Sequence, residues 1–496
     1  MTSVQAERDC ANDGVLYRAQ AIWAKRVNLA SVPIDLVVRN ATIVTPEGRM
    51  GPNAGVAVDD GTIVAIASDE SLPDATTVID ADGNYLTPGI VDCHIHNRSP
   101  GLEYKEDWET ATRAAAAGGV TTVVGMPNTD PAIDRPEHVE TKATLGEEKA
   151  IVDFQFYAVI TADNYDAVDA LDESGVLGFK VFLGTTVGEI PPPNDGQLVE
   201  AMEGVAETGK RLGFHEENND ILEHVTAKFR AAGKNEPIDH AHSRPPIAER
   251  EAISRTCLFA EETGAKIHMF HVSIGSGARL VARAKERGID VTAETMPHYL
   301  WFTEDVLREK GNVAKIQPPI RDRDEQDLLW EAGVHGDGID CIATDHAPHT
   351  DEEKGMDDPF GNTWDVMAGF VGLETEVPAM LTFVDEGRLS LEHWVEMHAR
   401  RPAQIWGMYP EKGSLQLGTD ADMTIVDPEE TWTLEDRHTL HSKSTVTPFE
   451  GETFTGRATT TIVRGNVVYD DGTVVGEPGD GRLVDVDSFD GESGHR

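Results

Sequence analysis

The chain has 496 residues, with 88 acidic and 42 basic side chains and a formal net charge of −46. This length allows one large domain plus a smaller one, and the charge argues against nucleic acid or an anionic membrane as a partner. The acidic residues are spread along the whole chain, and molar salt shortens the range of their repulsion to about 3 Å. We therefore expect a protein from a halophile that accumulates salt.

Neither a membrane span nor a secretory leader is evident in the sequence. The four cysteines are scattered and include no Cys-x-x-Cys pair, which is typical of a reducing compartment. These features predict a cytoplasmic protein without a membrane partner.

The two ends of the chain have a similar pattern. Residues 1–34 contain no strand or metal motif and are predicted to be an N-terminal extension. Short β segments separated by turns fill residues 35–88, and the same style returns over 412–480, so we expect both regions to form one small β-sandwich domain. Residues 481–496 are predicted to be an acidic C-terminal tail.

Between these regions, over residues 89–411, apolar runs alternate with helical segments such as 107–117 and 249–263. This rhythm is typical of βα units with a parallel sheet. Eight candidate strands over this length predict a (β/α)8 TIM barrel. The candidates are 89–96, 121–127, 154–160, 178–184, 211–215, 266–273, 290–295 and 340–346.

The first of these strands ends in two histidines. His94 and His96 are two residues apart, so their side chains project from the same face of a strand. Two imidazoles on one face can act as a pair of metal ligands, although nearby histidines are also common in packing.

Four further candidate strands carry residues of the type that binds metals. They contribute Lys180, His215, His271 and Asp345. Functional residues of such a barrel gather at the C-terminal ends of its strands, so these side chains are expected to converge. Their convergence predicts a metal site.

Lys180 lies between apolar neighbours, where a bare ammonium is costly to bury. One interpretation is that its charge reaches solvent or pairs with an acid. The other is that its neutral amine reacts with CO₂ to give a carbamate, whose two oxygens can bridge two cations. Four imidazoles, one carboxylate and a bridging carbamate would suit two Zn²⁺ ions per chain, which can together activate a shared hydroxide.

Taken together, these residues resemble the amidohydrolase superfamily, and within it the cyclic amidohydrolases: dihydroorotase, hydantoinase or dihydropyrimidinase, and allantoinase. The resemblance implies that His94, His96, Lys180 and Asp345 hold one metal. It implies that Lys180, His215 and His271 hold the other. Asp345 would also act as general base and acid on a small cyclic amide, and the protein is expected to be a homo-oligomer, either a dimer or a tetramer.

The run from His94 to Asp107 looks like the dihydroorotase signature, His-x-His-x-Arg followed by Pro-Gly-x-Glu-x-Lys-Glu. The resemblance implies that Arg98, Asn128 and His349 contact the substrate. A planar arginine fork suits the carboxylate on a dihydroorotate ring. These residues predict a dihydroorotase, which interconverts dihydroorotate and N-carbamoyl-L-aspartate in pyrimidine biosynthesis.

Other segments depart from that pattern. Asn97-Arg98-Ser99 replaces the usual Leu-Arg-Glu, and Gln317 stands where an asparagine is common. Residues 240–246 and 294–298 fit a hydantoinase or an allantoinase at least as well. The alternative is therefore a D-hydantoinase, dihydropyrimidinase or allantoinase, and a non-catalytic scaffold paralogue is a more remote one.

Overall fold

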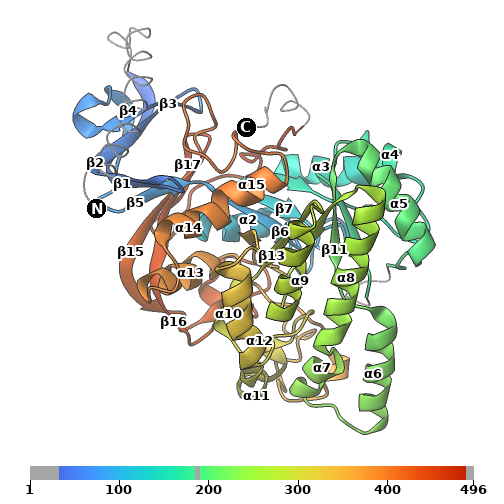
Figure 1. The fold of residues 1–496 in the computed structure, drawn as a ribbon. Helices are drawn as coiled ribbons and strands as arrows, with labels where there is room; N and C mark the ends of the chain where they lie inside the picture. The colour runs from blue at the N-terminus through green and yellow to red at the C-terminus, as the bar shows by residue number, and fades with distance from the viewer. Residues whose placement is uncertain (1–32, 185–189, 487–496) are drawn as a thin grey trace, which may run out of the picture.

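The computed structural model describes residues 33–184 and 190–486. The chain forms a β-rich domain, at the upper left of Figure 1, beside a barrel of strands that is surrounded by helices. The predicted N-terminal extension and most of the predicted acidic tail lie outside the described residues.

The barrel wall consists of eight parallel strand positions, which the chain visits in order. A parallel bridge between Ile95 and His346 joins the first position to the last, so the ring closes. The predicted (β/α)8 barrel is confirmed. Its strands are β6 (Ile90–Ile95), β7 (Val120–Gly125), β8 (Asp153–Phe156), β9 (Ala158–Val159), β10 (Phe179–Phe182), β11 (Arg211–His215), β12 (Lys266–Met269), β13 (Val291–Thr295) and β14 (Cys341–Ile342).

Most barrel strands are shorter than the expected ranges, and the third and eighth positions differ in form as well. The third position is interrupted at Tyr157, so β8 pairs with β7 while β9 pairs with β10. The eighth strand is only two residues long, and Asp345, shortly after it, has a left-handed φ of 47°. A left-handed residue cannot continue an extended strand, which explains why the regular part ends early.

Helices cover the outside of the barrel and connect successive strands (Figure 1). The expected helices 107–117 and 249–263 are present, and a capping box between Asp107 and Thr110 sets the start of the first. The helices are α2 (Trp108–Ala117), α3 (Pro136–Lys149), α4 (Val168–Asp172), α5 (Asp195–Thr208), α6 (Asn219–Ala231), α7 (Pro237–Ser243), α8 (Pro246–Thr263), α9 (Gly275–Glu286), α10 (Pro297–Trp301), α11 (Asp305–Glu309), α12 (Arg323–Leu328), α13 (Glu376–Asp385), α14 (Leu391–Val395) and α15 (Arg401–Ile405).

The β-rich domain is built from both ends of the described chain. β5 pairs with β1 on one side and antiparallel with β15 on the other, which joins strands far apart in sequence. The strands near the start of the chain and those near its end share an apolar cluster that includes Val38, Val56 and Ile425. Its strands are β1 (Ile34–Thr45), β2 (Gly48–Asp59), β3 (Thr62–Ser68), β4 (Ala75–Asp80), β5 (Tyr85–Pro88), β15 (Met423–Thr433), β16 (Thr453–Val463), β17 (Asn466–Asp470) and β18 (Thr473–Val474).

An ionic cluster joins the β-rich domain to the base of the barrel. The buried ammonium of Lys412 lies 2.5 Å from Asp153 at the start of β8, and 2.7 and 2.8 Å from Asp420 and Asp422 before β15. The C-terminal segment also meets this end of the barrel, because the backbone N–H of Arg482 donates to Asp153. The amino ends of the strands therefore serve as a structural joint.

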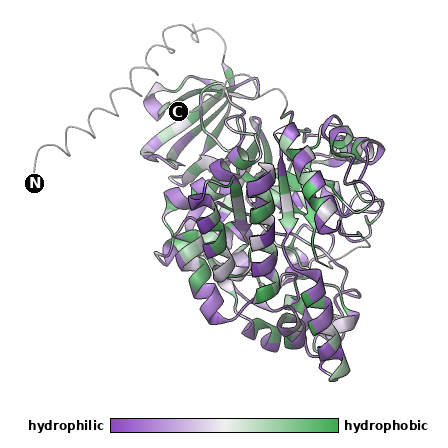
Figure 2. Ribbon diagram, turned by 45° about the vertical axis from the view of Figure 1, so that its right-hand side comes forward, coloured by the Kyte–Doolittle hydropathy of each residue, from purple (hydrophilic) through white to green (hydrophobic). Residues whose placement is uncertain are grey.

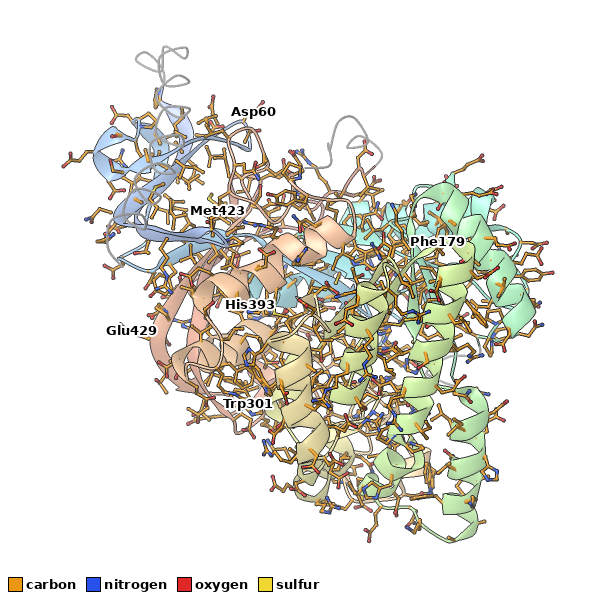
Figure 3. All side chains as sticks on the ribbon, viewed as in Figure 1. Asp60, Phe179, Trp301, His393, Met423 and Glu429 are labelled. Atoms are coloured by element: carbon orange, nitrogen blue, oxygen red, sulfur yellow. The ribbon has the colours of Figure 1, made fainter. Side chains whose placement is uncertain are left out.

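Hydropathy follows this architecture. In Figure 2 the barrel strands are largely hydrophobic, and the outer helices carry purple, hydrophilic faces. Figure 3 shows side chains filling the space between elements, with Phe179 on β10 and Met423 on β15; both are fully buried. Strands of a parallel barrel are covered on both faces, which explains their nearly continuous apolar sequence.

Among the described residues, no helix is long and apolar enough to cross a membrane.

Candidate metal centre

The predicted metal ligands meet at the carboxyl end of the barrel. His94 lies on β6, Lys180 on β10 and His215 at the end of β11. His271 and Asp345 follow β12 and β14 by two and three residues. Because the strands are parallel, all these positions reach one rim.

The first group consists of His94, His96 and Asp345, whose potential ligand atoms all lie within 4.8 Å of one another. Oδ1 of Asp345 is 3.3 Å from Nε2 of His94 and 3.1 Å from Nε2 of His96. Two imidazole nitrogens and a carboxylate oxygen that converge in this way can hold a divalent cation.

The second group consists of His215 and His271. Nδ1 of His215 lies 3.0 Å from Nε2 of His271. The ring centroid of His271 is 5.3 Å from that of His94, so the two groups are adjacent. The four imidazoles therefore form one continuous cluster.

Lys180 is 1% exposed, and its ammonium has no hydrogen-bond partner among the described residues. Nζ lies 3.8 Å from the ring centroid of Phe270. Burial lowers the pKa of Lys180 to about 8. A buried amine without a fixed partner fits a side chain that is modified or neutralised in the working protein.

Burial also sets the charge of the cluster. It lowers the pKa of His94, His96 and His271 well below the usual histidine range, and the positive charges nearby lower it further. Neutral imidazole is the form that binds metals. Burial raises the pKa of Asp345 to about 7, and Lys180 opposes that shift. Buried Nε2 of His94 and Nδ1 of His271 have no hydrogen-bond partner in the described chain, so the residues fit a metal centre.

Three of these imidazoles are oriented by a further polar group. Nδ1 of His94 contacts Oε1 of Glu294 at 2.5 Å, and Nδ1 of His96 contacts Oδ1 of Asn128 at 2.7 Å. The other ring nitrogen then points toward the cluster. The same arrangement fixes His215, whose Nε2 contacts Glu217 at 2.9 Å. Such partners orient metal-binding histidines and raise their basicity.

The backbone is strained at three positions around this rim. Arg98, His271 and Asp345 have φ values of 58°, 39° and 47°, in the left-handed region that non-glycine residues rarely adopt. Strain of this kind is found where surrounding structure holds a functional side chain in place.

A small hollow of about 30 Å³ opens beside the cluster. Its lining includes the ligand pair His96 and Asp345 together with the predicted substrate residues Arg98 and Asn128. Gln317, which replaces the commonly found asparagine, also lines it. Polar groups from several loops therefore face the space next to the candidate metal centre.

Arg98 is buried, and its guanidinium is held on one side only. Nε donates to the backbone oxygen of Pro348, and Nη2 lies 3.2 Å from Nε2 of His349. Nη1 has no hydrogen-bond partner among the described residues. His349 does not line the hollow: its Nε2 also faces the carbonyl of Ala368, so it lies behind Arg98. A substrate contact by His349 stays a prediction.

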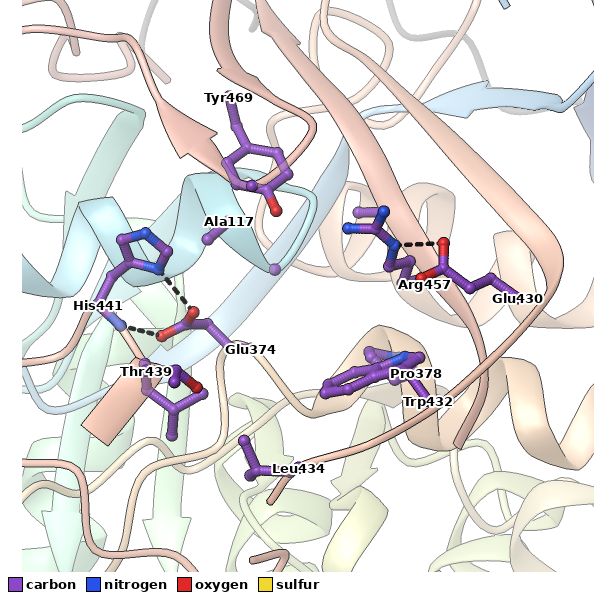
Figure 4. A pocket seen from close by; sticks show the side chains of 14 residues that line it. Ala117, Glu374, Pro378, Glu430, Trp432, Leu434, Thr439, His441, Arg457 and Tyr469 are labelled. Carbon is purple, nitrogen blue, oxygen red and sulfur yellow. Dashed lines mark hydrogen bonds and ion pairs between the residues drawn. The ribbon is translucent and has the colours of Figure 1, made fainter. Parts of the chain in front are cut away.

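Larger hollows lie elsewhere. One of about 270 Å³ is lined by Trp432, Tyr469 and the ion pairs His441–Glu374 and Arg457–Glu430 (Figure 4). It shares no lining residue with the hollow at the barrel rim. We therefore assign the functional site to the smaller hollow, because the converging imidazoles and the carboxylate lie beside it.

Glu294, Glu217 and Lys142 were not predicted as site residues. Glu217 follows His215 by two positions, so the run of two acids after a strand-end histidine is a signal that could have identified it. Glu294 interrupts the apolar strand β13 and could have been identified in the same way. Lys142 lies on α3, far in sequence from the ligands, and no local pattern marks it.

Comparisons with known proteins agree with this geometry. The model of the Amidohydrolase family matches residues 85–468. The chain is 38% identical to an allantoinase of Deinococcus radiodurans, with 91% of this chain and 98% of that protein covered. It is 35% identical to a dihydroorotase of a Geobacter species, with 88% and 100% covered. The solved structure of an L-hydantoinase (dihydropyrimidinase) from Arthrobacter aurescens superposes with a TM-score of 0.87 at 34% identity, covering 91% of this chain and 100% of that one.

Proposed function

The chain belongs to the amidohydrolase family, and we propose that it hydrolyses the ring amide bond of a cyclic ureide such as allantoin or a 5-substituted hydantoin. The observation that carries this proposal is the convergence of four imidazoles, Asp345 and Lys180 at one rim of the barrel. Allantoinases and a hydantoinase are among its relatives, which supports this ring class over the dihydroorotate that the sequence motifs favour.

The proposed centre holds two divalent metal ions, with zinc as the expected element because histidine nitrogen and carboxylate oxygen suit it. His94, His96 and Asp345 would hold one ion, His215 and His271 the other, and Lys180 as a carbamate would join them. When bound, such ions polarise a carbonyl oxygen and lower the pKa of water.

The protein's own groups supply the rest of the reaction. Asp345 lies at the hollow beside His96, where its carboxylate can accept a proton from the attacking water and return it to the leaving ring nitrogen. The burial that raises the pKa of Asp345 toward neutrality suits a group that must both accept and release a proton. Asn128 and Gln317 offer amides to the polar edge of the ring.

Dihydroorotate is a second candidate substrate, favoured by one observation. Arg98 lines the hollow, its Nη1 has no hydrogen-bond partner among the described residues, and a guanidinium is a strong partner for a ring carboxylate. Neither allantoin nor a simple hydantoin carries a carboxylate, so only dihydroorotate is expected to need Arg98 for binding.

A substrate panel tests the choice. Zinc-loaded protein in molar KCl would be offered allantoin, a 5-substituted hydantoin, dihydrouracil and dihydroorotate, and ring opening would be followed by absorbance or chromatography. The highest kcat/KM for allantoin or the hydantoin supports the proposal. A preference of at least tenfold for dihydroorotate would replace it with the second candidate. Hydrolysis of none of these rings would count against both and leave a non-catalytic role.

A further inference from the structure

We propose that Lys142 is a positioning residue that fixes the turn carrying Arg98, and so sets where the guanidinium meets the substrate. Lys142 lies in α3, on the outside of the barrel, and is 0% exposed. The inference rests on the second candidate of the proposed function, a ring that carries a carboxylate, because that ring is the one expected to contact Arg98.

The ammonium of Lys142 binds the residues on both sides of Arg98. Nζ donates to Oδ1 of Asn97 at 2.8 Å and to the backbone oxygen of Ser99 at 2.9 Å. A single cation thus joins the side chain before Arg98 to the carbonyl after it. No described contact links Lys142 to Arg98 itself, so the effect is transmitted through the turn.

The turn needs such support because Arg98 adopts a left-handed conformation, with φ of 58°. Residues other than glycine adopt that conformation only when their surroundings hold them there. Within the turn, the N–H of Ser99 donates to the carbonyl of Asn97, and the N–H of Leu102 donates to the carbonyl of Arg98. Lys142 satisfies the side-chain oxygen of Asn97 and the carbonyl of Ser99, which these bonds leave unused.

Two aromatic rings lie close to the ammonium of Lys142, and the negative charge of Glu103 acts on it without forming an ion pair. Nζ lies 5.1 Å from the ring centroid of Trp108 and 5.9 Å from that of Phe156. In the described chain, no carboxylate forms an ion pair with it. Burial, together with the charge of Arg98, lowers the pKa of Lys142 to about 7. An ammonium that is buried without a carboxylate destabilises a fold, so its presence here is better explained by the turn that it holds than by packing.

Space around the contact is limited as well. A Cβ at Gly125, at the end of β7, would lie 3.1 Å from Oδ1 of Asn97 and 3.2 Å from Cε of Lys142. The barrel strand therefore leaves room for the lysine to reach the turn.

The turn also places Arg98 at the wall of the hollow. The guanidinium is fixed by the carbonyl of Pro348, and the unbonded Nη1 belongs to a residue that lines the space beside His96 and Asp345. Because the guanidinium lies at the end of a long side chain, even a small rotation of the turn would displace it from the hollow. Lys142 therefore controls substrate binding from the far side of the strand.

Kinetics of Lys142→Met, alone and combined with Arg98→Met, test the proposal on a ring that depends on Arg98. We expect KM to rise about tenfold in Lys142→Met, with kcat within about twofold and two metals retained. In the double variant the two effects on KM should not add, because displacement of an absent guanidinium has no consequence. Additive effects, or an unchanged KM in Lys142→Met, would overturn the proposal.

Lys310→Met is the matched control. Lys310 also donates to two backbone carbonyls, those of Pro448 and Glu450, but lines no part of the hollow. Its replacement should leave KM unchanged. If Lys142→Met does not fold, Asn97→Ala removes one acceptor of the same contact and should raise KM in the same direction by a smaller factor.

A crystal structure of Lys142→Met provides a readout without turnover. We expect Arg98 to leave the left-handed region or its guanidinium to leave the carbonyl of Pro348. An unmoved Arg98 would contradict the positioning role. If the wild-type protein opens none of the rings tested, the proposed function fails, while this structure still decides whether Lys142 positions the turn.

Discussion

Oε1 of Glu294 lies 2.5 Å from Nδ1 of His94, and neither side chain is exposed to solvent. The same oxygen is 3.3 Å from the backbone N–H of His271, so Glu294 touches both groups of the candidate metal centre. In the barrel, β13 lies next to β12, which precedes His271. On its other side only β14 separates it from β6, which carries His94, so one carboxylate reaches both histidines. Glu294 is therefore placed to fix ligand geometry without binding the metal itself.

Glu294→Gln should weaken metal binding by about 10–100-fold, because the glutamine keeps the shape but cannot ionise to the carboxylate that orients His94. Competition with a chromophoric chelator would measure the affinity. Glu304→Gln, at a half-buried glutamate that contacts His242 away from the centre, is the control. Equal affinities in Glu294→Gln and the wild type would show that His94 needs no acidic partner.

Lys180→Ala should lose most bound metal, since the proposed carbamate would join both sites. Elemental analysis of the purified variant measures this loss, and a short carboxylic acid such as propionate should restore part of the metal and activity. Lys210→Ala, near the start of β11, is the control. Two ions per chain in a fully active Lys180→Ala would rule out the carbamate.

Asp345→Asn should lower kcat by about 10²–10⁴-fold, the range that proton transfer by a positioned side chain contributes. The amide keeps an oxygen near His94 and His96, so the variant should still retain metal. Steady-state kinetics and elemental analysis on the same sample separate the two effects. Substantial turnover with metal present would assign proton transfer to another group.

Arg98→Met distinguishes the candidate rings. For a ring with a carboxylate, loss of a buried charged partner should lower kcat/KM by at least about 30-fold, which corresponds to about 2 kcal/mol. For allantoin or a hydantoin the change should stay within about threefold. A similar loss for both classes would mean that Arg98 supports the loop rather than the substrate.

The pair His441–Glu374, in the hollow of Figure 4, predicts a dependence of stability on pH. Nδ1 of His441 contacts Glu374 at 2.8 Å, and this hydrogen bond raises the pKa of the imidazole. Because the pKa is higher in the folded protein, the pair stabilises it below about pH 6.5, and the contribution is lost as the pH rises through the folded pKa. The difference in Tm between wild type and His441→Gln should therefore be larger at pH 6 than at pH 8.5. A difference that grows with pH would contradict this assignment.

Much of the fold follows from local sequence patterns. The barrel strands are buried on both faces, so their apolar runs were visible in the sequence, and the ligands lie at strand ends as the parallel arrangement requires. The interruption at Tyr157 was not predictable. That residue's hydroxyl donates to the carbonyl of Cys93 across the barrel, a contact between distant segments.

The site residues, too, were predictable from the sequence only in part. His94, His96 and Asp345 were predicted from their places at the ends of candidate strands, and they do converge. Glu103 and Glu106 lie close to Arg98 in the sequence, yet the guanidinium donates to the carbonyl of Pro348, and Glu103 accepts from Ser99. Such choices depend on the three-dimensional path of loops, which short-range patterns do not encode.

The pairing of β5 with β15 has a consequence for biosynthesis. Tyr85–Pro88 can complete its pairing only after Met423–Val426 have been synthesised. At translation rates of about 5–20 residues per second, that interval is on the order of 20–70 s. During this time the nascent β1–β5 segment presents an unpaired edge, while the barrel strands emerge in the order in which they pair. We therefore expect the growing chain to carry one open hydrogen-bonding edge while its barrel strands pair, a binding surface for a chaperone until the last strands are made.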